Sequence, residues 1–101
     1  MNRRLKFHQI LIEVLGSEQV YFQPPATVKM KYPAIVYNRS RINIKLADDE
    51  LYGVTAGYTV SVIDPNPDSD IPGRMFKLPM CRFSRHYTAN NLNHDVFDVY
   101  F

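Results

Sequence analysis

The spacing of the hydrophobic positions changes after residue 16, and this change separates a predicted helix from predicted strands. Over residues 3–15 the apolar side chains recur at the spacing of one helical face: Phe7, Ile10, Leu11, Val14 and Leu15. Gly16 follows, and glycine commonly ends helices. Beyond it the apolar positions recur about every second residue, which is the period of a strand. We therefore expect a helix followed by a sheet.

The middle of the chain predicts three strands: residues 19–23, 34–46 and 51–63. The first stops at the pair Pro24-Pro25. The second is apolar on both sides at residues 34–37 and then alternates, as in a strand with one buried face. We expect residues 41–46 and 57–63 to pair as an antiparallel hairpin with a long tip at Asp48-Asp49-Glu50.

The last third of the chain predicts a short helix and a terminal strand. Ser69 or Asp70 would cap the helix, Pro72 is tolerable in its first turn, and Pro79 ends it. Residues 80–87 are extended and give an uncertain additional strand, residues 88–94 are a turn region, and residues 95–101 are a strand. The order α-β-β-β-α-β predicts one α+β domain over residues 1–101, with both helices on one face of a mainly antiparallel sheet.

Composition limits the kinds of partner. A net charge of +2 is too small to indicate nucleic-acid binding, although Arg3, Arg4 and Lys6 keep a small nucleic-acid-binding module as an alternative. The single cysteine, Cys81, excludes an internal disulfide and favours a reducing cytoplasm. No apolar run spans a bilayer, and we expect neither a signal peptide nor a membrane partner. Seven Tyr and six Phe exceed what one small core hides, so some should lie at a protein interface.

Two polar segments follow the third strand, and the first is the loop at residues 64–70. Asp64, Asn66 and Asp68 alternate like the start of a calcium loop. However, an EF-hand requires Gly at the sixth position and Glu at the twelfth, where this chain has Ser69 and Met75. We therefore interpret the loop as a rigid turn, with side-chain oxygens bonded to nearby backbone N–H groups, and such a turn suits a docking surface.

The second polar segment contains His86 and His94, eight residues apart, which is not a zinc-ligand spacing. Two histidines with an arginine could perform acid–base chemistry in a small enzyme, but nothing in the sequence requires them to converge. Asn90 and Asn91 are typical of a tight turn. We expect no catalytic residue, no metal and no cofactor. The candidate assembly contacts are the polar residues of these segments: Asp64, Asn66, Asp68, Asp70, Arg82, Arg85, Asn90, Asn91, Asn93, His94 and Asp95.

Several short segments occur in an order that resembles one family. They are Tyr32-Pro33, Val62-Ile63-Asp64, Pro67-Asp68-Ser69, Arg82 with Arg85, Asn91-Leu92-Asn93-His94 and the aromatic strand at residues 96–101. Together they resemble the tail-terminator, or tail-completion, proteins of long-tailed bacteriophages. They span most of the chain after the first helix.

The resemblance implies a structural virion protein, made in the bacterial host cytoplasm. Such proteins form a ring, usually of six copies, at the head-proximal end of the tail tube. The ring ends tube polymerisation and joins the tail to head-completion proteins, and DNA passes through its lumen without specific binding. A head–tail connector, or adaptor, of the same neck region is the alternative. As a hypothesis, residues 57–63, 64–70 and 90–95 contribute the subunit or tube contacts.

Overall fold

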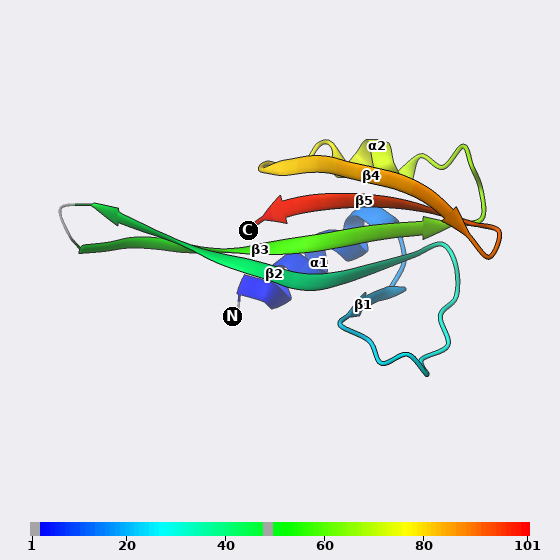
Figure 1. Cartoon of the computed structure of the whole chain (residues 1–101), viewed down its shortest axis with the longest axis horizontal. Coiled ribbons are helices and arrows are strands. Elements are labelled where there is room, and N and C mark those ends of the chain that lie inside the picture. Colours follow the sequence, from blue (N-terminus) through cyan, green and yellow to red (C-terminus); the bar gives the residue numbers. More distant parts are fainter. Residues whose placement is uncertain (1–2, 48–49) are drawn as a thin grey trace.

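The computed structural model describes residues 3–47 and 50–101 and the side chains outside residues 41–55. Over this part the chain forms two helices and five strands (Figure 1): α1 (Arg3–Leu15), β1 (Val20–Phe22), β2 (Ala34–Ala47), β3 (Glu50–Asp64), α2 (Ile71–Met75), β4 (Cys81–Ala89) and β5 (Leu92–Tyr100). The sheet order is β1-β2-β3-β5-β4, and only β1 pairs parallel to its neighbour. The predicted α+β fold is confirmed, with β4 as an additional strand.

Helix α1 has the bounds that the apolar spacing predicts, and it buries the predicted face. Phe7, Leu11, Val14 and Leu15 are buried against the sheet. The helix ends at Gly16, whose φ of 83° lies in the left-handed region that glycine adopts without strain. The Gly16 N–H donates to the Ile12 carbonyl at 2.8 Å, so this carbonyl in the last turn of the helix has a hydrogen-bond partner.

An aromatic cluster centred on Phe7 attaches α1 to the sheet. The ring of Phe7 is 99% buried, stacks on Tyr58 of β3 at 4.7 Å and meets Tyr37 of β2 edge-on at 5.6 Å. It also stacks on Phe101 at 5.3 Å. One helical side chain therefore holds two strands and the residue after β5 together.

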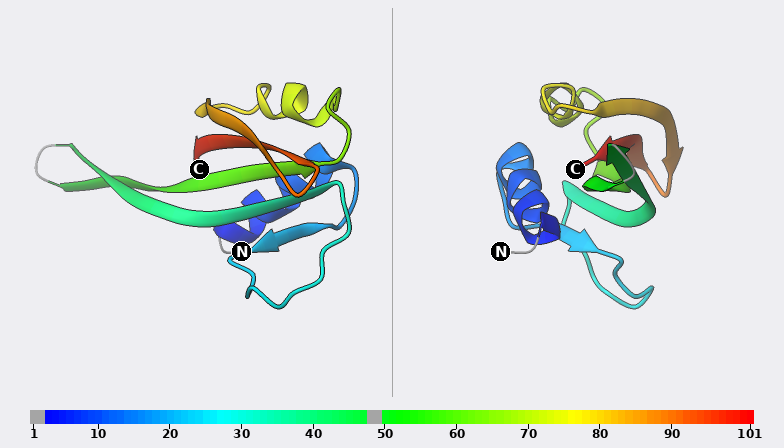
Figure 2. Two further views of the ribbon diagram at one scale, coloured as in Figure 1. Left: turned by 45° about the vertical axis from the view of Figure 1, so that its right-hand side comes forward. Right: turned by 90° about the vertical axis from the view of Figure 1, so that its left-hand side faces the viewer.

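Helix α2 joins the same core through Ile71 and Met75 and lies on the same side of the sheet as α1 (Figure 2). Asp70 occupies the cap position without a side-chain cap bond, while the Ser69 hydroxyl accepts the Ile71 N–H at 3.2 Å. The Arg74 guanidinium donates to the Val14 carbonyl near the end of α1 at 2.7 Å. This bond ties the two helices to each other as well as to the core.

The hairpin of β2 and β3 is longer than predicted, and its register differs. Residues 34–39 pair with residues 58–63, and antiparallel pairing continues outward to Ala47 and Glu50. The expected pairing of 41–46 with 57–63 and the long tip are therefore wrong; of the expected tip residues, Asp48 and Asp49 lie outside the described residues. The alternating pattern fixes which residues share a face, but it does not fix which residue lies opposite which.

Strand β4 is a full strand, and the turn before β5 is shorter than the predicted region 88–94. Ala89 pairs with Leu92, so only Asn90 and Asn91 form the loop. Their φ angles of 52° and 62° are both positive, as a two-residue type I′ hairpin requires. Asparagine tolerates positive φ better than most residues, so Asn90 and Asn91 alone can connect the two strands.

We expect Phe7→Ala to lower the free energy of unfolding by about 3–5 kcal/mol, because it removes a buried ring and leaves a cavity between α1 and the sheet. Urea unfolding followed by circular dichroism measures this change. Leu5→Ala is the matched control, since Leu5 lies on the same helix but is 47% exposed. Equal losses in both variants would contradict the central position of Phe7.

Candidate functional site

The loop between β3 and α2 is held in shape by its own side chains. The Asp64 carboxylate accepts the Asn66 N–H at 2.8 Å, and the Asn66 side-chain oxygen accepts the Asp68 N–H at 3.0 Å. These successive Asx turns agree with the rigid-turn interpretation of the sequence. Because Asp64 and Asn66 each direct a side-chain oxygen to the backbone, these turns hold the loop in shape without a bound ion.

The β4–β5 turn is joined to this loop by Asn93. Asn93 lies opposite Asp64 in the sheet, and its side-chain amide donates to the carbonyl oxygens of Asp64 at 3.2 Å and Pro65 at 3.4 Å. Two segments about thirty residues apart thus form one polar surface. We call this surface the polar end; it comprises Asp64, Asn66, Asp68, Asp70, Asn90, Asn91 and Asn93. It lies around the end of β3, at the opposite end of that strand from its start at Glu50 (Figure 1).

The acidic residues of the polar end differ in exposure. Asp64 is 8% exposed, and its carboxylate accepts a hydrogen bond from the backbone of the loop. Asp68 and Asp70 are exposed. A partner would therefore contact Asp68 and Asp70 directly, whereas Asp64 maintains the shape of the loop.

The remaining predicted residues on β4 and β5 lie on two different faces of the sheet. His86 pairs with Asp95, and their side chains meet at 2.7 Å between Nδ1 and Oδ1. His94 pairs with Tyr87 one position along, so it lies on the opposite face, where its ring stacks on Tyr87 at 4.5 Å. Arg85 lies over the same Tyr87 ring at 5.2 Å. The two histidines therefore do not form one acid–base site.

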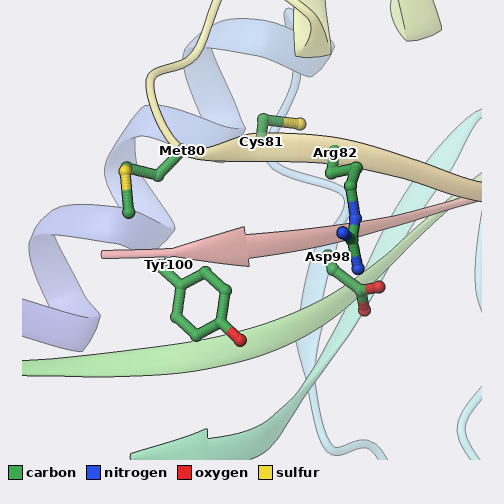
Figure 3. A pocket seen from close by; sticks show the side chains of 5 residues that line it. All are labelled: Met80, Cys81, Arg82, Asp98 and Tyr100. Atoms are coloured by element: carbon green, nitrogen blue, oxygen red, sulfur yellow. The ribbon is translucent and has the colours of Figure 1, made fainter. Parts of the chain in front are cut away.

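Arg82 is separated from the other predicted contacts and lies at the start of β4. It lines a pocket of about 420 Å³ with Met80, Cys81, Asp98 and Tyr100 (Figure 3). Arg82 pairs with Asp98 in the sheet register, and their side chains lie on the same side of the sheet (Figure 3). Burial, reinforced by the negative charge of Asp98, raises the pKa of the Cys81 thiol. These surroundings favour an unionised thiol, which is a poor nucleophile.

The basic residues near the N-terminus make contacts within the molecule. Arg3 donates to the Phe101 carbonyl at 3.3 Å and lies over its ring, and Arg4 donates to the Tyr37 hydroxyl at 3.2 Å. His8 shares that hydroxyl, with 2.7 Å between its Nδ1 and the oxygen. These guanidinium groups help to fix α1 on the sheet, which weakens the nucleic-acid interpretation of the cluster.

Residues 57–63, which we expect to contribute to subunit or tube contacts, could do so only through their side chains. This part of β3 pairs with β2 on one side and with β5 on the other. Its backbone groups are therefore occupied on both sides. The side of β3 that faces β5 is unpaired only over residues 50–55, before Ala56.

Sequence reasoning missed an exposed apolar patch beside β4. Phe76, Met80 and Phe83 are 57%, 62% and 42% exposed. Phe76 and Phe83 each pack edge-on against the buried ring of Phe97, at 5.3 and 5.5 Å. The abundance of aromatic residues predicted an exposed subset but did not identify it, because only the packing decides which rings the core covers.

The described residues offer no metal site and no membrane-spanning helix, and the sequence matches no known family. Among the described residues no group of three or more His, Cys, Asp or Glu side chains could hold a metal ion. Neither helix in the described part of the chain is long and apolar enough to cross a membrane. No model of a known protein family matches the sequence, and no curated protein matches it significantly.

We expect Asp64→Ala to lower the free energy of unfolding by about 1–3 kcal/mol, because the Asn66 N–H loses its acceptor. Asp64→Asn keeps an oxygen at the same position and should recover most of that loss. Chemical denaturation measures both variants. Asp68→Ala serves as the exposed control and should stay within about 0.5 kcal/mol of wild type. A loss for Asp68→Ala as large as that for Asp64→Ala would contradict the division of roles.

The pKa of His94 is lowered by burial and then by His86, while Asp95 partly offsets the shift. The unfolded chain therefore binds a proton more readily than the folded chain, and His94 costs stability as the pH falls below about 6.5. We expect His94→Phe, which keeps an aromatic ring over Tyr87, to lose less stability than wild type between pH 7.5 and 5. Thermal melts at both pH values test this, and identical losses in both proteins would contradict it.

Proposed function

We propose that this chain is a structural protein of a tailed phage particle. In this proposal it forms a ring, of about six copies as in the family it resembles, at the head-proximal end of the tail tube. The ring ends tube polymerisation and provides the surface on which the head is joined. The partners would be further copies of the chain, the tail-tube protein and a head-completion protein, with DNA passing through the lumen without specific binding.

The first support is that the segments carrying the family resemblance meet in space. Tyr32-Pro33 directly precedes β2, and the first residue of β2, Ala34, lies opposite Ile63. Ile63 in turn lies opposite His94, and Asp64 lies opposite Asn93. Three pieces of sequence that are far apart in the chain thus form one end of the sheet. A shared surface of this kind suits a docking role.

The observation that carries the proposal is that the sheet has two unlike open edges. β4 borders the sheet at one side, whereas residues 50–55 of β3 extend past the end of β5 and have no strand on that side among the described residues. Unlike complementary surfaces produce heterologous contacts, which close into a ring when the rotation between neighbours closes. A chain with this design suits a ring better than a two-fold dimer.

Within the ring we assign the polar end to the contact with a second protein rather than to the contact between copies. Asp68 and Asp70 stand exposed on a loop stiffened by hydrogen bonds, so docking would require little ordering of the loop. A rigid acidic surface favours a basic patch on the partner. Asn90 and Asn91, held in their tight turn, would lie at the border of the same contact.

Removing the gene from the phage that encodes it should give particles with tails of unregulated, excessive length and few joined heads. Electron microscopy of lysates measures tail length and head attachment. Wild-type protein supplied from a plasmid should restore normal particles. Tails of normal length beside DNA-filled, tailless heads would contradict a terminator and favour the connector.

The double variant Asp68→Ala with Asp70→Ala should restore normal particles poorly in the same complementation assay, because the proposed docking surface loses its charge. Lys29→Ala with Lys31→Ala is the matched control, since both lysines are exposed on the segment before β2. It should complement like wild type. Full complementation by the aspartate variant would remove the polar end from the proposed contact.

A further inference from the structure

The outer part of the β2–β3 hairpin forms a two-stranded arm without further support from the sheet. Residues 42–47 pair with residues 50–56, and the ribbon projects beyond all other labelled elements (Figure 1). We call residues 42–47 and 50–55 the arm. Six residues per strand give it a length of about 20 Å. Isolated two-stranded hairpins are at best marginally stable in water, so the arm needs a partner surface.

One edge of the arm is vacant because the pairing of β3 with the terminal strand stops at Ala56. Ala56 and Phe101 exchange both backbone hydrogen bonds, at 2.9 and 3.4 Å, and they form the outermost pair on that side. From residue 55 to residue 50 no strand among the described residues pairs with this side of β3. One further strand, placed in line with β5, could therefore pair with residues 50–55.

Strand β4 presents the complementary feature at the border of the sheet. It pairs with β5 on one side only, and all its residues from Arg82 to Ala89 are exposed. In an antiparallel strand alternate residues direct their N–H and C=O groups away from the paired neighbour. Exposed edges of this length pair readily with other strands unless they are protected. The bulge at Ser84 and the two arginines restrict which strand this edge accepts.

The charges of the two strands of the arm indicate that residues 50–55 of β3, rather than the β2 strand, fit against β4. Residues 50–55 contain one acidic residue, Glu50, and no basic residue, whereas β4 contains Arg82 and Arg85 and no acidic residue. The other strand of the arm contains Lys45 and follows Arg41, so it would place like charges against β4. Like charges opposite each other destabilise a strand pair, and opposite charges stabilise it.

Apolar surfaces beside the two edges also complement each other. Next to the base of the arm, Leu5, Ile10 and Phe101 help to line a pocket of about 520 Å³ whose walls are mainly apolar. Beside β4, the exposed patch of Phe76, Met80 and Phe83 lacks such a cover in a single copy. Exposed apolar patches mark interaction sites, and here one chain carries both an exposed apolar patch and an apolar pocket.

We propose that β4 of one copy pairs with residues 50–55 of β3 in the next copy. The pairing gives hydrogen-bond partners to the backbone N–H and C=O groups on both strand edges. The Phe76–Met80–Phe83 patch of one copy covers the apolar pocket beside Phe101 of the next. Each copy gives one surface and receives another, so the contact is heterologous and repeats from copy to copy. This inference rests on the proposed function in one respect, because it supplies the subunit contact that the ring requires.

Cysteine cross-linking between two populations of the full chain tests the contact. Both carry Cys81→Ser; a tagged population also carries Val54→Cys in the arm, and an untagged one carries Tyr87→Cys in β4. After mixing and treatment with a short bis-maleimide, we expect a mixed cross-linked dimer on denaturing gels. Like-with-like products should not exceed the background of a control population with Lys29→Cys, a residue exposed outside both surfaces. Circular dichroism verifies that each variant is folded.

A mixed product at the level of the Lys29→Cys control would overturn the proposal. So would a dominant product between two Val54→Cys copies, because it would show arms pairing with each other. Cross-linking and tail length report on different claims. A mixed product together with normal tail lengths in the gene deletion would leave the contact standing and overturn the tail function; overlong tails without a mixed product would do the reverse.

Charge exchange gives a second readout of the same contact. Arg82→Glu with Arg85→Glu on the untagged population should abolish the mixed product, because β4 then repels Glu50. Adding Glu50→Lys to the tagged population should restore it, because opposite charges again face each other across the new strand pair. An unchanged yield in the Arg82→Glu, Arg85→Glu variant, or failure of Glu50→Lys to restore the product, would count against the proposed pairing.

Discussion

The rest of the structure depends on the packing of Phe7 between α1 and the sheet. Its ring contacts Tyr58 in β3, Tyr37 in β2 and Phe101 after β5, so a single side chain fixes the helix, the two longest strands and the end of the terminal strand. A chain of this size has only one thin core, and most of its stability comes from such shared contacts. Everything outside this packed centre has to be stabilised locally or by partners.

The two ends of β3 illustrate these two solutions. At the inner end, Asp64 leads into a loop whose turns are fixed by Asp64, Asn66 and Ser69, and Asn93 bonds that loop to the neighbouring hairpin. Hydrogen bonds to nearby backbone groups make this end rigid without a core. At the outer end the strand leaves the sheet as part of a two-stranded arm. Such an arm gains its stability when another strand and an apolar surface cover it.

Local features of the sequence determined much of the fold. The apolar spacing over residues 3–15 and the stop at Gly16 specified α1, because an amphipathic face and a left-handed residue are properties of a short segment. Asn90 and Asn91 indicated a turn for the same reason. The candidate site was predictable only in part: the rigid loop at Asp64 followed from local hydrogen bonding, but its union with Asn93 depended on strand order.

By itself the sequence determined the α+β class, the bounds of α1, the general positions of the strands and the polar character of the segments around Asp64 and Asn91. Only the tertiary structure decided the register of β2 against β3, the position of β4 at the border of the sheet and the opposite faces of His86 and His94. The physical reason is range. Helix spacing and turn chemistry act over a few residues, whereas register, edges and shared surfaces arise from contacts between segments that only packing brings together.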